Sequence, residues 1–231
     1  MSLPTTFLGL QTDVAQKAHM NLTDDGDRIK DWINTSYAEV ASTTRCFQRS
    51  ATSTLVSGTS SYTLDASVLH IELLTVTHSG SAWFPLKECE LEQILSYRAL
   101  NSAASGPPTS YALVGLNQLE LWPTPNSADT LTTWYSYLPT YLAADGDVPA
   151  LPEPHASNLL SYGALVQAAE AKRDIMMLGD FQSQYAAAMQ DFQRYLNRKA
   201  GAYPRSFPTW TRSGSYGPHD PSADVWGWNA A

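Results

Sequence analysis

Near the N-terminus, apolar and small side chains recur at spacings of three and four residues. This spacing places them on one face of a helix: Ile29, Trp32, Ile33, Ser36, Tyr37 and Val40. Thr23 and the three aspartates that follow it supply capping oxygens and negative charge at the start, where the helix dipole favours both. The pattern predicts a helix over residues 24–46, preceded by a shorter one over residues 12–20 with Thr12 as its N-cap.

Between residues 51 and 140 the pattern changes from helical spacing to alternation. Leu69, Ile71 and Leu73 alternate with polar side chains, which is the period of a half-buried strand. This stretch predicts a strand over residues 68–77. Shorter runs predict further strands at residues 82–86, 111–114, 118–122 and 130–137, and one helix at residues 88–100.

After an acidic turn, Asp145-Gly146-Asp147, the helical spacing returns. Pro152 and Pro154 are tolerated near a helix start, and their rigidity is expected to fix the angle between the strands and the following helix. One helical face is predicted from Leu159, Tyr162, Gly163, Val166 and Ala169, and a second seam runs to about Lys199. A break or a kink is expected between Asp174 and Gly179.

Helices at both ends of the chain therefore flank a β-rich middle. Each end alone offers too little apolar surface, so the simplest arrangement packs the N-terminal helix on the C-terminal ones. This predicts an α+β fold with a helical base from residues 1–50 and 150–200 and an inserted, sandwich-like β-rich domain from residues 51–149. Aromatic side chains are expected to pack between helices or between subunits: Trp32, Tyr37, Phe181, Tyr185, Phe192 and Tyr195.

The segment from residue 201 to residue 231 shows no period and contains many prolines and glycines, so an extended C-terminal tail is predicted. Disordered linkers are normally poor in aromatic residues, but this tail is rich in them. Two interpretations follow: the aromatic side chains anchor in pockets on another chain, or the tail wraps its own domain. The candidate anchors are Tyr203, Phe207, Trp210, Tyr216, Trp226 and Trp228.

The charge balance argues against a nucleic-acid-binding surface. The chain has 22 acidic residues against 14 lysines and arginines, a net charge of −8, so a basic footprint for phosphate is missing. No run approaches the roughly 18 apolar residues of a membrane span, and the N-terminus shows no signal-peptide pattern. Cys46 and Cys89 lie far apart in the sequence and lack the spacing of metal ligands. We therefore expect reduced thiols in a protein of the cytosol.

The candidate metal-binding and catalytic residues are better explained by structural roles. Asp145, Asp147, Glu153 and His155 lack the ligand spacing of zinc or calcium sites, and a turn followed by a helix cap is favoured. Neither a nucleophile elbow nor a phosphate-binding glycine loop occurs. We therefore predict no catalytic residue, no metal site, no cofactor and no enzymatic activity.

Several short motifs then occur in a fixed order. They are Ile29, Trp32 and Tyr37 in the helix predicted over residues 24–46; Tyr111-Ala112-Leu113; Leu119-Glu120-Leu121-Trp122-Pro123-Thr124-Pro125; Leu131 to Leu138; Tyr141-Leu142; Asp145 to Asp147; Leu151-Pro152-Glu153; and Leu160-Ser161-Tyr162-Gly163-Ala164-Leu165. In this order the chain resembles the adaptor proteins of tailed bacteriophages, the head-to-tail connectors that bind below the portal. The resemblance spans most of residues 24–195.

The resemblance implies a structural function in the neck of the virion. Such adaptors form a ring, commonly dodecameric, that extends the DNA channel below the portal protein and docks a downstream tail or nozzle protein. Genomic DNA would pass through the lumen without sequence-specific binding. The implied location is the virion, with assembly in the host cytoplasm and no membrane partner. As a hypothesis, Trp210, Trp226 and Trp228 anchor the tail on the portal.

Two other classes of function stay open. A carbohydrate- or receptor-binding virion protein would use the Trp-rich β region, with Trp83, Trp122 and Trp134 as a stacking surface, although packing is the favoured role of these side chains. A hydrolase with a dispersed site would depend on His155.

Overall fold

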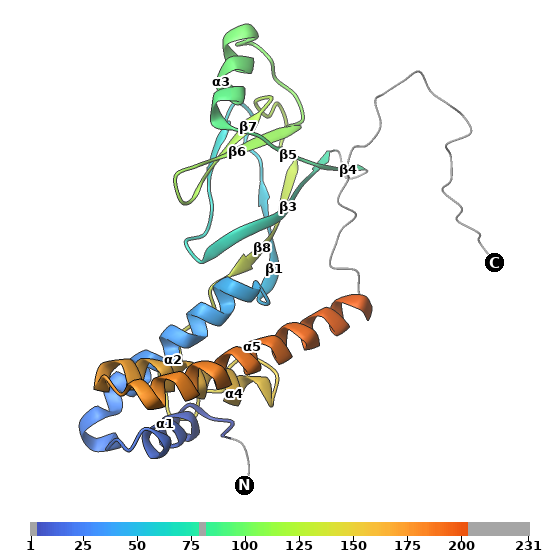
Figure 1. The fold of residues 1–231 in the computed structure, drawn as a ribbon. Helices are drawn as coiled ribbons and strands as arrows, with labels where there is room; N and C mark the ends of the chain where they lie inside the picture. The colour runs from blue at the N-terminus through green and yellow to red at the C-terminus, as the bar shows by residue number, and fades with distance from the viewer. Residues whose placement is uncertain (1–3, 79–81, 203–231) are drawn as a thin grey trace, which may run out of the picture. The chain divides into compact units, whose positions relative to one another are not determined.

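The computed structural model of the protein describes residues 4–78 and 82–202 (Figure 1). The first compact unit of the chain ends at Gln193, and the contacts described below lie within it. No helix in this described part of the chain combines the length and the apolar character that a membrane crossing requires.

The first helix, α1, spans Phe7–Lys17 and starts earlier than predicted. Thr6 is its N-cap, because the Thr6 hydroxyl accepts a hydrogen bond from the Gly9 N–H at 3.2 Å. Thr12, the predicted cap, instead donates its hydroxyl to the Leu8 carbonyl inside the helix at 2.8 Å. The predicted start at residue 12 was wrong, since several residues of this sequence can serve as a cap.

The second helix, α2, spans Leu22–Thr44, close to the predicted range. Its cap is Asn21, whose side-chain oxygen accepts from the Thr23 N–H at 3.0 Å. Arg45 ends the helix in the left-handed conformation, with φ of 49°. The predicted apolar face is buried except for Trp32, which is half-buried: the buried members are Ile29, Ile33, Ser36, Tyr37 and Val40.

The C-terminal helices are α4, His155–Lys172, and α5, Ile175–Ala202. The chain turns at Arg173, which has φ of 57°, and Asp174 then accepts from the Met177 N–H at 3.1 Å. Gly179 lies inside α5, so the break falls at the start of the predicted interval. Because α4 packs against both α1 and α2, it buries more than the one predicted face, including Leu160, Ala164 and Leu165.

Three helices meet at Gly163. A β-carbon at this position would lie 2.6 Å from the Ser36 hydroxyl oxygen and 3.3 Å from the Tyr185 ring. The glycine thus permits the close approach of α2 to α4 that the sequence predicts. The N-terminal helices pack with the C-terminal helices, which confirms the helical base of the predicted α+β fold (Figure 1).

The inserted β region consists of two four-stranded sheets. The first sheet is antiparallel throughout. Its order is β1 (Gln48–Thr54), β8 (Thr130–Tyr137), β3 (Val68–His78) and β4 (Ala82–Pro85). The order of the second sheet is β2 (Ser61–Thr63), β7 (Gln118–Trp122), β6 (Ser110–Val114) and β5 (Lys87–Glu88). Side chains from both sheets share one core, including Leu74, Val76, Leu119, Leu121 and Leu131.

The predicted strand at residues 82–86 is divided between the sheets. β4 pairs with β3 in the first sheet, whereas β5 pairs in parallel with β6 in the second. Leu86, at the crossing, is buried in the shared core. The helix predicted at residues 88–100 accordingly starts later, as α3 at Leu91–Leu100.

The alternation predicted for β3 holds for only part of the strand. The pairing of β3 with β8 shifts register twice, before His70 and before Leu73. Each shift inserts an extra residue and reverses which side chains face the core. The core positions are therefore Ile71, Leu74 and Val76, while Leu69 is exposed.

Candidate functional site

The segment 138–154, between β8 and α4, joins the sheets to the helices. Asn34 on α2 holds it through two hydrogen bonds with the backbone of Leu142: the amide nitrogen donates to the carbonyl at 3.0 Å, and the amide oxygen accepts from the N–H at 2.9 Å. The Asn34 side chain therefore pairs with this backbone as a neighbouring strand would.

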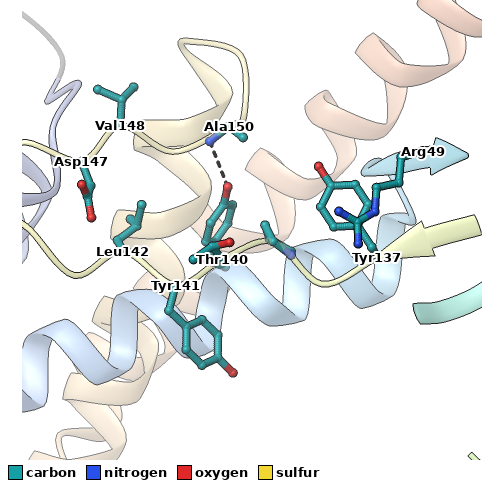
Figure 2. Close-up of a pocket in the computed structure, with 10 residues that line it drawn as sticks. Arg49, Tyr137, Thr140, Tyr141, Leu142, Asp147, Val148 and Ala150 are labelled. Atoms are coloured by element: carbon teal, nitrogen blue, oxygen red, sulfur yellow. Dashed lines mark hydrogen bonds between the residues drawn. The ribbon is translucent and has the colours of Figure 1, made fainter. Parts of the chain in front are cut away.

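Tyr37, one turn further along α2, holds the other end of the segment. The Ala150 N–H donates to the Tyr37 hydroxyl at 2.9 Å, as the dashed line in Figure 2 shows. Burial raises the pKa of Tyr37, and the hydrogen bond from Ala150 offsets part of that rise. The Tyr37 hydroxyl thus accepts the hydrogen bond that fixes this end of the segment to α2.

The acidic turn within this segment supports α1. The Asp147 carboxylate accepts from two backbone N–H groups of its own turn, at 2.7 and 2.8 Å, and these bonds lower the pKa of Asp147. The backbone carbonyls of Asp147 and Asp145 accept from the N–H groups of Phe7 and Leu8 at 2.8 and 3.0 Å. These N–H groups belong to the first turn of α1 and need acceptors from outside the helix.

An aromatic series connects the same helix to the first sheet. The rings of Tyr37 and Phe47 meet edge to face with centroids 5.6 Å apart, and Phe47 lies 6.0 Å from Tyr137. Such pairs contribute about 0.5–1.5 kcal/mol each beyond the area they bury. The guanidinium of Arg49 lies 4.6 Å from the Tyr137 ring and donates to the Tyr135 hydroxyl at 2.7 Å.

These elements surround a pocket of about 470 Å³, whose lining includes Tyr37, Arg49, Tyr137, Leu142 and Val148 (Figure 2). The ten residues of its lining include no histidine, cysteine or serine. The pocket lies at a structural junction, and three side chains of its lining, Tyr37, Arg49 and Asp147, are engaged in hydrogen bonds within the protein.

The other residues considered as metal ligands have structural partners. The Ser157 hydroxyl lies 2.7 Å from the Glu153 carboxylate and 2.8 Å from the Pro4 carbonyl oxygen. The His155 ring lies 5.4 Å from the Phe192 ring. Among residues 4–78 and 82–202, no three His, Cys, Asp or Glu side chains gather as metal ligands would.

The predicted packing residues differ in their burial. Tyr37 and Phe192 are buried, whereas Trp32, Phe181 and Tyr185 are half-buried. Burial, followed by the nearby Glu39 carboxylate, raises the pKa of Tyr185. Tyr195 belongs to the part of the chain after Gln193. The six predicted tail anchors, residues 203–228, lie outside the described residues.

Two tryptophans of the predicted stacking surface, Trp122 and Trp134, lie on different sheets. Trp122 on the second sheet stacks on Tyr97 of α3, with ring centroids 6.3 Å apart, while Trp134 lies on the first sheet and is 39 % exposed. The side chain of Trp83 lies outside the described set. A carbohydrate-stacking surface therefore gains no support from the two tryptophans whose positions are described.

The sequence pattern did not indicate one buried ionisable group, Asp129. The Asp129 side chain is only 4 % exposed and lies 2.9 Å from Nδ1 of His78. The Asp129 carbonyl also accepts from the Leu55 N–H at 2.8 Å. Nothing in the spacing of residues 78 and 129 predicts this pair, because the pairing of β3 with β8 brings them together.

The described residues thus form packed helices, two sheets with a shared core, and a hydrogen-bonded junction between α2 and the segment 138–154. The chain belongs to the SU10 adaptor protein family, since a family model of that description matches residues 5–215. It is thus a phage adaptor, a structural head-tail connector protein, as the resemblance implied. A comparison with curated proteins gave no match.

Proposed function

We propose that this adaptor forms a ring below the portal protein, extends the channel for the genomic DNA and presents a docking surface to a downstream tail or nozzle protein. The observation that carries the proposal is the family match over residues 5–215. Because the portal is a ring, a dodecameric adaptor ring would match its symmetry. The protein would assemble in the host cytoplasm and remain in the neck of the virion.

The junction has a mechanical role in this proposal. Hydrogen bonds from Asn34 and Tyr37 and the aromatic series through Phe47 connect α2 to the segment 138–154 and to β8. A connector transmits the position of one partner to the next, so its two parts need a fixed relation. The domains of the proposal are the helical base, residues 1–50 and 150–200, the β region, residues 51–149, and the tail, residues 201–231.

The charge of the chain suits the lumen of such a ring. With a net charge of −8, the protein repels the phosphate backbone more than it attracts it. DNA bound through many lysine and arginine contacts would be retained rather than passed. The proposal therefore includes genomic DNA that moves through the ring without sequence-specific contacts.

The first prediction concerns the contribution of the junction to the stability of the fold. Replacing Asn34 with alanine is expected to lower the free energy of unfolding by about 1–2 kcal/mol, because the N–H and C=O of the buried Leu142 lose their partners. Urea unfolding measures the change. Thr35→Ala, an exposed neighbour on the same helix, is the control and should cause no loss of stability; an equal loss in both variants would contradict the assigned role.

A second prediction tests the proposed partner. The full chain, mixed with the portal protein of the same phage, is expected to give a complex that contains several adaptor copies, measured by mass photometry. Deleting residues 201–231 is expected to abolish that complex, because the tail carries the candidate anchors. The triple variant Trp210→Ala, Trp226→Ala and Trp228→Ala keeps the length of the tail and should show the same loss.

The outcomes separate the two levels of the proposal. A full chain that does not bind the portal would contradict the adaptor function as proposed. A deleted chain that binds as tightly as the full chain would leave that function standing and would sink the role of the tail.

A further inference from the structure

The first sheet has an open edge at β1. In the described part of the chain, β1 pairs only with β8, and all seven of its residues are exposed. In an antiparallel pair, every second residue turns its N–H and C=O away from the partner strand. The outer edge of β1 therefore presents backbone donors and acceptors that no described strand pairs with.

β1 also lacks the features that normally protect an edge. Its sequence, Gln-Arg-Ser-Ala-Thr-Ser-Thr, contains no proline or lysine, and its register with β8 runs from Gln48 to Thr54 without a bulge. Its one charged side chain, Arg49, is held by Tyr135 and Ser67. The edge strands of the second sheet have only three and two residues. A long, regular and unprotected edge favours pairing with another strand.

The face of β1 that continues the core side of the sheet is uncovered as well. Ala51 and Ser53 stand opposite Thr133 and Leu131 of β8. Thr133 and Leu131 are 6 % and 2 % exposed, whereas both β1 residues are exposed. The core of the two sheets thus covers β8 and stops before β1. The small side chains of β1 leave room for neighbouring side chains on this face.

The opposite edge of the same sheet has a matching direction. The pairs β1–β8, β8–β3 and β3–β4 are all antiparallel, so β4 runs antiparallel to β1. If β4 of one copy lies beside β1 of the next, the alternation of strand directions continues unbroken. A contact between two different surfaces of the same protein closes into a ring when the rotation between copies permits it.

We propose that β1 is the inter-subunit strand of the adaptor: its outer edge pairs antiparallel with β4 of a second copy, which links the first sheets into one continuous β-ring. This inference rests on the proposed ring and specifies its contact. β4 has four residues, so it pairs along part of β1. Of the β4 residues that face away from β3, Trp83 and Pro85, only Trp83 has an N–H to donate, because the Leu86 N–H donates to the Leu74 carbonyl and this register turns residues 82, 84 and 86 toward β3. The carbonyls of Trp83 and Pro85 would accept from outward-facing N–H groups of β1.

Two proline variants of the full chain, Ala51→Pro and Thr52→Pro, test the contact. Adjacent residues of β1 direct their N–H groups to opposite sides of the strand. Ala51→Pro therefore loses a hydrogen bond to β8, whereas Thr52→Pro loses a donor at the open edge. The first variant should unfold at a lower urea concentration as a monomer. The second should keep the wild-type unfolding midpoint and lower the yield of rings on the portal by at least about tenfold, the effect of losing about 1.4 kcal/mol per contact.

Hydrogen exchange on the wild-type ring provides an independent measurement. On ring formation, the outward-facing amides of residues 48–54 should gain protection, and this result does not depend on the folding of any variant. Unchanged exchange in β1 would overturn the proposal. Protection that appears only after a downstream tail protein is added would also overturn it, because that edge would then serve a different partner.

The failure of the ring and the failure of the edge contact are distinguishable. If the wild-type chain forms no ring with the portal, the proposed function itself fails. If the wild-type chain forms rings and the stable proline variant forms them equally well, the ring stands and the role of β1 is wrong.

Discussion

Replacing Phe192 with alanine is expected to lower the free energy of unfolding by about 3–5 kcal/mol. Phe192 lies on α5, is fully buried and places its ring 5.4 Å from the ring of His155 at the start of α4. Truncation removes apolar contacts and leaves a cavity that the two helices fill only in part. The loss would confirm that α5 belongs to the packed helical base.

Urea unfolding followed by circular dichroism measures this change. Met176→Ala is the matched control, because Met176 lies on the same helix and is 85 % exposed; its effect should stay within about 0.5 kcal/mol. A Phe192 variant as stable as the control would contradict the packing of α5 on α4.

Replacing Gly163 with leucine is expected to cost at least about 3 kcal/mol, because overpacking a tight core forces neighbouring groups to move. Even the first added carbon would lie 2.7 Å from the β-carbon of Ser36 on α2, and the Tyr185 ring closes the space on the side of α5. A shift of one side chain does not relieve a contact with a β-carbon, so the helices must separate.

Gly179→Leu supplies the matched control for this substitution. Gly179 lies inside α5, is exposed, and a β-carbon there would meet nothing within 4 Å. Leucine is a better helix former than glycine by roughly 0.5–1 kcal/mol, so this variant should be as stable as the wild type or more so. If both leucine variants unfold at the same urea concentration, the close approach at Gly163 is not a requirement of the fold.

The periodic segments of the fold were predictable because periodicity reflects burial on one side. The range of β8 agrees with the predicted strand at residues 130–137, and the apolar face of α2 is buried as its spacing indicates. The caps were harder to predict. More than one Thr or Asn lies near the start of each of the first two helices, and only the folded backbone shows that Thr6 and Asn21 accept the bonds.

The pairing of strands does not follow from alternation alone. The two register shifts in β3 and the change of sheet at Leu86 depend on which strand lies beside which. The segment 138–154 stands out in the sequence through its prolines and acidic turn. Its partner Asn34 lies 108 residues away from Leu142 and resembles any other polar residue of a helix, so the amide contact could not be foreseen.

Electron cryomicroscopy of the full chain mixed with its portal protein tests the proposed function most directly. The proposal predicts a closed ring of adaptor subunits stacked on the portal, with an open central channel in line with the portal channel. An adaptor that stays separate from the portal, or that binds it as isolated copies without closing a ring, would contradict the proposed function.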